Sequence, residues 1–123
     1  MENAKKYRVA IYCRVGNPDD ADTALEMQKK VLRKYASAKG YEVTAEISEA
    51  ASGLSIDRDG IRKIIELAER QAMDEVLAVG FSRYSRNVVD MLRLKNGFEK
   101  KHIKLNALKE MPLASMVRGK TSV

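Results

Sequence analysis

Cysteine and histidine are scarce in this chain of 123 residues, which holds one of each. The lone cysteine, Cys13, excludes an intrachain disulfide and is typical of a reducing compartment. The histidine, His102, has no cysteine or acidic cluster beside it, whereas metal sites need several such ligands together. We therefore predict a chain that folds on its own apolar core, with no metal and no cofactor.

Long hydrophobic runs are missing as well. The longest uncharged apolar run covers residues 76–81, whereas a membrane-spanning helix needs about 20 such residues. The charged start, Met-Glu-Asn-Ala-Lys-Lys, leads into a short apolar stretch that ends before Arg14, which does not fit a signal peptide. We expect a cytoplasmic protein that does not bind membranes.

Positive charge exceeds negative charge. Lysine and arginine number 23 against 17 aspartates and glutamates, which gives a net charge of +6. Such a balance suits a protein that binds a polyanion such as nucleic acid. Many basic proteins bind no nucleic acid, so the charge alone leaves this open.

Four apolar runs predict strands, at residues 8–12, 41–47, 75–80 and 103–108. The first and third are almost continuous in valine, alanine, isoleucine and leucine, which is typical of parallel strands buried on both faces. Three stretches of helical period lie between them. Their predicted buried positions are Leu25, Gln28, Leu32, Tyr35 and Ala36, then Ile61, Ile64, Ile65 and Ala68, then Val88, Met91, Leu92 and Phe98.

Two residues mark helix ends: Gly40 is predicted to stop the first helix, and Asp57 to cap the start of the second. The alternation of strands and helices predicts an α/β fold. We expect a three-layer structure, with a mainly parallel four-stranded sheet and helices on both faces.

Polar loops follow three predicted strands, at residues 17–22, 48–56 and 82–87. Parallel strands place their carboxyl ends at one edge, where open α/β sheets bind ligands. Four arginines belong to these connections: Arg14, Arg58, Arg83 and Arg86. Since guanidinium pairs with phosphate oxygens, the grouping predicts an anion site. The alternative is that each arginine pairs with a nearby carboxylate, such as Asp57, Asp59 or Asp90.

Three motifs in the same order resemble the catalytic domain of the serine recombinases, the resolvase/invertase family. Residues 12–16, Tyr-Cys-Arg-Val-Gly, resemble its Tyr-x-Arg-Val-Ser. Residues 51–61, Ala-Ser-Gly-Leu-Ser-Ile-Asp-Arg-Asp-Gly-Ile, are similar to its Ser-Gly…Arg-Pro/Glu-Gly-Leu segment. Residues 82–87, Ser-Arg-Tyr-Ser-Arg-Asn, are similar to its Asp/Ser-Arg-Leu-x-Arg-Asn. The resemblance covers roughly residues 7–110 and implies a resolvase-like fold.

The resemblance also implies a chemistry. In that family a serine hydroxyl attacks a DNA phosphodiester and forms a phosphoserine link, which is reversed after subunits exchange strands. Arg14, Arg83 and Arg86 would hold the scissile phosphate, with Arg58 beside them. Ser52 and Gln28 would be supporting polar groups, and Tyr12 would line the pocket. Fixed arginines can compensate the phosphoryl charge without a metal.

One departure concerns the nucleophile. Gly16 stands where the family has its serine, and it has no side-chain oxygen to attack phosphorus. Loss of a nucleophile commonly costs about a million-fold in rate. The other hydroxyls, on Thr23, Ser52, Ser55, Ser82 and Ser85, belong to different structural positions, so we expect an inactive copy.

The other departure concerns length. Full-length members continue into a long helix and DNA-binding domains, and they act as dimers or tetramers. Here we expect one catalytic domain, residues 1–110, and a tail, residues 111–123, that is truncated or frayed before such a helix. The expected partner is DNA, with this fragment a monomer or weak dimer.

Three functions therefore stay open. The first is the catalytic domain of a site-specific DNA recombinase that is inactive because Gly16 replaces the nucleophilic serine. The second is a non-catalytic module that binds DNA or an active recombinase as a regulator. The third is an unrelated α/β protein whose arginines bind a small anion.

Overall fold

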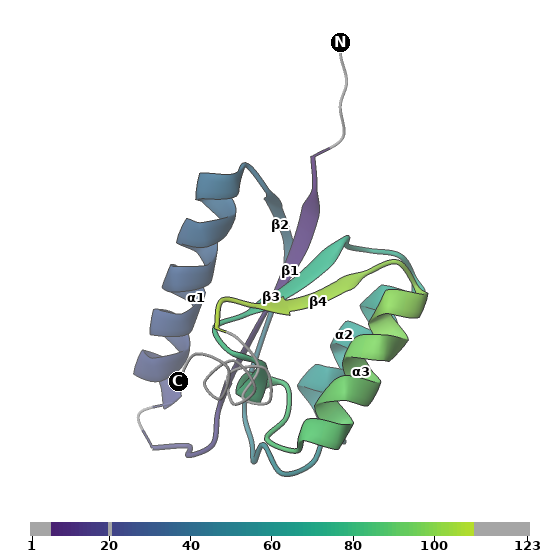
Figure 1. Ribbon diagram of the computed structural model, residues 1–123. Coiled ribbons are helices and arrows are strands. Elements are labelled where there is room, and N and C mark those ends of the chain that lie inside the picture. Colours follow the sequence, from purple (N-terminus) through teal and green to yellow (C-terminus); the bar gives the residue numbers. More distant parts are fainter. Residues whose placement is uncertain (1–5, 20, 110–123) are drawn as a thin grey trace, which may run out of the picture.

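The computed structural model describes residues 6–19 and 21–109, and Figure 1 shows their arrangement. The strands are β1 (Arg8–Val15), β2 (Glu42–Ala50), β3 (Glu75–Ala78) and β4 (Lys104–Ala107). The helices are α1 (Ala21–Lys39), α2 (Asp59–Glu69) and α3 (Val88–Lys100), with a short 3₁₀ helix, η1 (Phe81–Arg83), after β3. The predicted tail, residues 111–123, lies outside the described residues.

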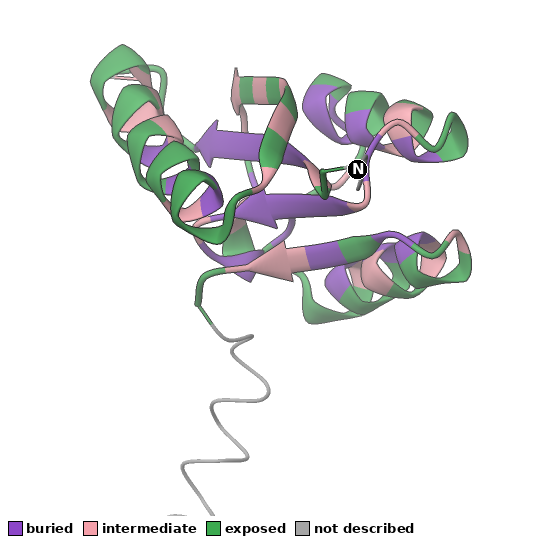
Figure 2. Cartoon of the chain, turned by 90° about the horizontal axis from the view of Figure 1, so that it is seen from above, coloured by how far each residue is buried: buried purple, intermediate pink, exposed green. Residues whose placement is uncertain are grey.

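The sheet has the order β2-β1-β3-β4, and all three strand pairings are parallel. Its helices lie on both faces, α1 on one and α2 with α3 on the other (Figure 1). Figure 2 shows the central strands, β1 and β3, buried along almost their whole length. The predicted three-layer α/β fold is confirmed.

Alternation along β1 divides the core into two halves. Ala10 and Tyr12 pack with α2 and α3, whereas Val9, Ile11 and Cys13 pack against α1. Successive residues of a strand point to opposite faces, so an uninterrupted apolar run fills both. Gly40 ends α1 in the left-handed region, with φ of +76°, as predicted.

Some predicted details were wrong. β1 continues to Val15, so Arg14 belongs to the strand and does not follow it. Asp57 is not the cap of α2: Arg58 holds that position and makes no side-chain cap. On α3, Val88 and Leu92 are exposed, because the helix buries the face that carries Met91, Leu94 and Phe98 at spacings of three and four.

No helix among the described residues has both the length and the apolar character needed to cross a membrane.

Candidate functional site

Arg14 lies near the carboxyl end of β1 and fastens three segments together. Its buried guanidinium donates from Nε to the Arg83 carbonyl, from Nη1 to the Ala51 carbonyl and from Nη2 to the Ser82 carbonyl, each at 2.8 Å. Two of its five N–H groups remain for other acceptors. Arg14 thereby joins the loop after β2 to the segment after β3.

Gln28 explains why a polar residue occupies the buried face of α1. Its side-chain amide accepts from the Arg14 backbone nitrogen at 3.1 Å and donates to the Arg14 carbonyl at 2.9 Å. Nη1 of Arg83 donates to the same carbonyl at 3.1 Å. The backbone of Arg14 is therefore fixed as firmly as its side chain.

Arg58 is also buried, and all three of its nitrogens are engaged. Nε contacts Glu49 at 3.3 Å, Nη1 donates to the Ser52 and Ser55 carbonyls, and Nη2 donates to the Tyr12 hydroxyl and the Tyr84 carbonyl. No N–H group of this guanidinium is left for an outside anion. Arg58 therefore holds the loops together, and the negative charge of Glu49 compensates its positive charge.

Glu49, on β2, is the residue that the sequence reasoning missed. Its carboxylate accepts from the Tyr12 hydroxyl, from Arg58 and, at 3.0 Å, from the backbone nitrogen of Gly60, where it supplies the missing cap of α2. A signal was present: Ala45 and Ile47 pack against the core, and alternation along the strand puts Glu49 on the same side. A carboxylate there needs partners.

Tyr12 is fully buried and reaches the site through these partners. Burial, and then the hydrogen bond to Glu49, raise the pKa of its hydroxyl well above the ordinary value. The hydroxyl therefore stays a neutral donor. Ser52 is exposed, and its hydroxyl accepts from the Leu54 backbone nitrogen at 3.2 Å, which shapes the loop between β2 and α2.

Arg83 and Arg86 complete the cluster on the solvent side. Arg83 is half-buried and Arg86 is exposed. The backbone nitrogen of Arg86 donates to the Gly53 carbonyl at 2.9 Å, and a Cβ atom on Gly53 would lie only 2.5 Å from Nη2 of Arg14. Only glycine at position 53 allows so close an approach. Neither Arg83 nor Arg86 forms an ion pair with any described residue.

The charges of the four arginines affect one another. Burial, followed by the charges of Arg58, Arg83 and Arg86, lowers the pKa of Arg14 below its ordinary value, although a guanidinium stays protonated in proteins. Of the carboxylates named as alternative partners, Asp57 and Asp59 pair with Arg62 instead. Arg58 does pair with a carboxylate, that of Glu49. Four arginines stand against one carboxylate, Glu49, so the cluster keeps a surplus of positive charge, which favours an anion over a cation.

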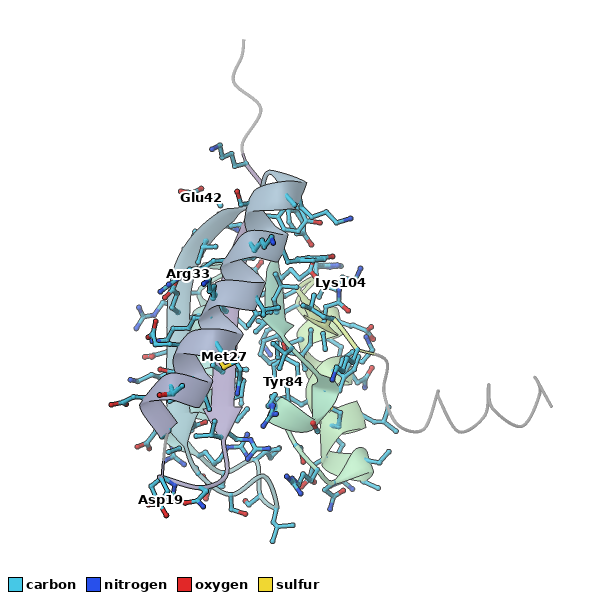
Figure 3. The ribbon with its side chains drawn as sticks, turned by 90° about the vertical axis from the view of Figure 1, so that its left-hand side faces the viewer. Asp19, Met27, Arg33, Glu42, Tyr84 and Lys104 are labelled. Carbon is cyan, nitrogen blue, oxygen red and sulfur yellow. The ribbon has the colours of Figure 1, made fainter. Side chains whose placement is uncertain are left out.

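Gly16 follows β1 at the solvent side of this cluster. It is exposed, and a Cβ atom there would meet a single neighbour, Nη1 of Arg14, at an ordinary contact distance of 3.8 Å. Its backbone does not adopt the left-handed conformation that would require glycine. The position accepts a side chain without strain. Figure 3 labels Asp19, in the loop just beyond Gly16, at the opposite end of the sheet from Glu42 and Lys104.

Within the part of the chain that the structure describes, no three His, Cys, Asp or Glu side chains gather as metal ligands would.

Comparisons with known proteins agree with this geometry. Residues 9–121 match the family model described as "Resolvase, N terminal domain". The fold is similar to the crystal structure of the C-terminal catalytic domain of ISC1926 TnpA, an IS607-like serine recombinase, with a TM-score of 0.77. The two sequences are 31% identical, and the match covers 94% of this chain and 78% of that one.

Two further structures are similar. The N-terminal catalytic domain of TP901-1 integrase is 31% identical, with a TM-score of 0.76, over 94% of this chain and 91% of that one. A resolvase family site-specific recombinase from Streptococcus pneumoniae shares the fold, at 24% identity and a TM-score of 0.73, over 95% of this chain and 87% of that one.

Proposed function

Because this chain belongs to the resolvase family of serine recombinases, we propose that it is a site-specific recombinase catalytic domain that binds a DNA phosphodiester and does not cleave it. The observation that carries the proposal is the position of Gly16 against the arginines. The Arg14 guanidinium is fixed by three carbonyls, and its Nη1 is the neighbour that a side chain on residue 16 would meet.

The four arginines divide the work in this proposal. Arg83 and Arg86 lack ion-pair partners among the described residues and would contact the non-bridging phosphate oxygens. Arg14 would contribute its remaining N–H groups, and Arg58 would act by holding the loops. Such preorganised donors stabilise the charge of a phosphoryl group without moving during the reaction. No atom of Gly16 can form the bond to phosphorus that cleavage requires.

A regulatory role is the second candidate, and one observation favours it. The bracing of Arg14 and Arg58 is complete although the nucleophile is missing, so the anion site does not depend on the serine. A domain of this kind would occupy a DNA site, or pair with an active recombinase, without cutting. We propose that this unit spans residues 1–110 and is by itself a monomer or weak dimer.

Restoring the serine tests the main proposal. The native chain, Gly16→Ser and Gly97→Ser are incubated with end-labelled duplex DNA of randomised sequence, and protein–DNA adducts are resolved in denaturing gels. Gly97→Ser is the matched control, because a Cβ atom there meets nothing within 4 Å and the substitution is likewise free of crowding. We expect adducts from Gly16→Ser alone. An adduct formed by the native chain would contradict the loss of cleavage.

DNA binding by the native chain is tested separately with a salt titration. Neutralising phosphates releases counterions, so the affinity for a short duplex should fall steeply with added salt. The same titration with inorganic phosphate separates DNA from a small anion. Binding of phosphate without binding of DNA would favour the small-anion protein.

A further inference from the structure

Tyr84 lies between the two arginines that face solvent, one residue after Arg83 and two before Arg86. Unlike them it is fully buried, and Figure 3 labels it inside the fold. Its ring stacks on the Tyr12 ring, with centroids 5.6 Å apart and planes at 15°, and contacts Phe81 at 6.2 Å. This side chain anchors an otherwise polar segment to the core.

The two ends of Tyr84 are fixed by hydrogen bonds to different parts of the molecule. Its hydroxyl donates to the Asn106 carbonyl on β4 at 2.6 Å, and its own carbonyl accepts from Nη2 of Arg58. Asn106 is held in turn, since its side-chain amide donates to Glu75 at 2.9 Å. The segment is thus tied to β1, to β4 and to the bracing arginine.

The backbone of the two outer arginines is also held by Arg14 and by the Gly53 carbonyl, but their side chains have few partners of their own. Arg83 donates to the Arg14 carbonyl, and the Arg86 side chain makes no hydrogen bond or ion pair with the described residues. Their directions therefore depend on the backbone of residues 82–86. A long side chain amplifies a small backbone rotation into a displacement of its charged end, and misplacement by about 1 Å can cost about a hundred-fold in a reaction.

We propose that Tyr84 is a positioning residue, which holds Arg83 and Arg86 in the arrangement that binds a phosphodiester and connects that arrangement to β4. This inference rests on the proposed function, since it assumes that the two arginines contact phosphate. Tyr84 itself would not touch the phosphodiester, because its side chain is fully buried. It acts through the backbone that it anchors and through the stacked ring of Tyr12.

The test compares Tyr84→Phe with Tyr7→Phe, each of which deletes one tyrosine hydroxyl that bonds inside the molecule. The Tyr7 hydroxyl donates to Glu75 at 2.9 Å, at the amino end of the sheet and away from the arginines. Glu75 also accepts from the Asn106 amide, so this control loosens the same chain of hydrogen bonds but leaves the bond between Tyr84 and the Asn106 carbonyl in place. Affinity for a short duplex is measured against salt, together with the Nε–H NMR signals of Arg83 and Arg86. Thermal unfolding of both variants is measured as well, to check that each one is folded.

We expect Tyr84→Phe to raise the Kd for duplex DNA about ten-fold, as loss of a buried hydrogen bond allows. The slope of log K against log salt should become shallower, by up to about 0.9 for each arginine that disengages. The arginine signals should shift or broaden. Tyr7→Phe should lower the unfolding temperature and change none of these quantities. Equal DNA affinity and unchanged signals in Tyr84→Phe would overturn the inference.

Amide hydrogen exchange of the unmodified chain tests the anchor without any substitution. Slow exchange at Tyr84 and Arg86 is expected, and fast exchange across residues 82–86 would overturn the anchoring. If the unmodified chain binds no DNA, the proposed function fails. The NMR and exchange measurements still decide whether Tyr84 orders the two arginines.

Discussion

At the scale of single residues, the four arginines differ in what surrounds each guanidinium. Arg14 and Arg58 are buried, and most of their hydrogen bonds go to carbonyl oxygens of the surrounding loops. The Arg86 side chain is exposed and has no partner among the described residues. A cluster of like charges is costly unless its members are solvated or paired. Arg58 therefore only braces the loops and Arg86 is open to an anion, whereas Arg14 keeps two N–H groups besides its three bracing bonds.

Arg86→Gln should weaken DNA binding with almost no loss of stability. Removing one phosphate contact should make the slope of log K against log salt shallower by about 0.9. An exposed substitution changes the free energy of unfolding by about 0.5 kcal/mol or less. Arg70→Gln is the matched control, because Arg70 is an exposed arginine paired with Glu66 on α2. Equal salt slopes for the two variants would show that Arg86 contacts no phosphate.

Glu49→Gln should destabilise the fold, because it leaves the buried charge of Arg58 uncompensated. Breaking a buried ion pair costs about 3 kcal/mol, whereas an exposed pair contributes about 1 kcal/mol or less. Glu46→Gln on the same strand is the control, since Glu46 pairs with Arg33 nearer solvent. Urea unfolding of both variants measures the difference. Similar losses in the two would mean that Glu49 is not a structural partner of Arg58.

At the scale of elements, α2 is fixed to the sheet through its first turn. The Glu49 carboxylate on β2 accepts from the Gly60 nitrogen, so the strand supplies the cap that the sequence around α2 lacks. A Cβ atom on Gly60 would collide with this carboxylate and with the Tyr12 ring. The close approach of helix and strand therefore depends on glycine.

The two helical glycines should respond oppositely to alanine. Gly60→Ala should destabilise the protein by about 1–3 kcal/mol, because the crowded side chains must shift. Gly97→Ala on α3, where a Cβ atom meets open space, should stabilise it by about 0.5–1 kcal/mol through helix propensity. Denaturant midpoints for the two variants check both signs. A stable Gly60→Ala would show that Glu49 does not approach the helix so closely.

At the scale of the whole molecule, the fold follows from sequence patterns and the bracing network does not. Continuous apolar runs and helical periods predict the layers, because a face that is buried carries apolar residues at a regular spacing. The arginines are predicted to lie together because their connections leave the carboxyl ends of parallel strands. The acceptors of Arg14 are not predicted, because they are the backbone carbonyls of residues 51, 82 and 83. Every residue type has such a carbonyl, so the sequence does not show which ones accept a hydrogen bond. That Glu49 faces the core can be inferred only when the extent and alternation of β2 are known.

Burial across the molecule should also make the fold sensitive to alkali. Burial raises the pKa of the Cys13 thiol from about 9 to about 11 and raises those of Tyr12 and Tyr84 above their ordinary values. The folded chain keeps these groups neutral at pH values where the unfolded chain ionises them. The contribution of Cys13 is therefore complete below about pH 9 and is lost as the pH rises through about 11. That of the two tyrosines begins to fall only above their ordinary pKa of 10.

Urea unfolding measured from about pH 7 to about pH 11 checks this expectation. The free energy of unfolding should fall by about 2–3 kcal/mol from Cys13 alone, since one pKa unit corresponds to about 1.4 kcal/mol. Cys13→Ala serves as the control and should show a shallower decline, with the tyrosines responsible for the remainder. A free energy that stays level across this range would mean that the strands exclude water less completely than the burial of Cys13 indicates.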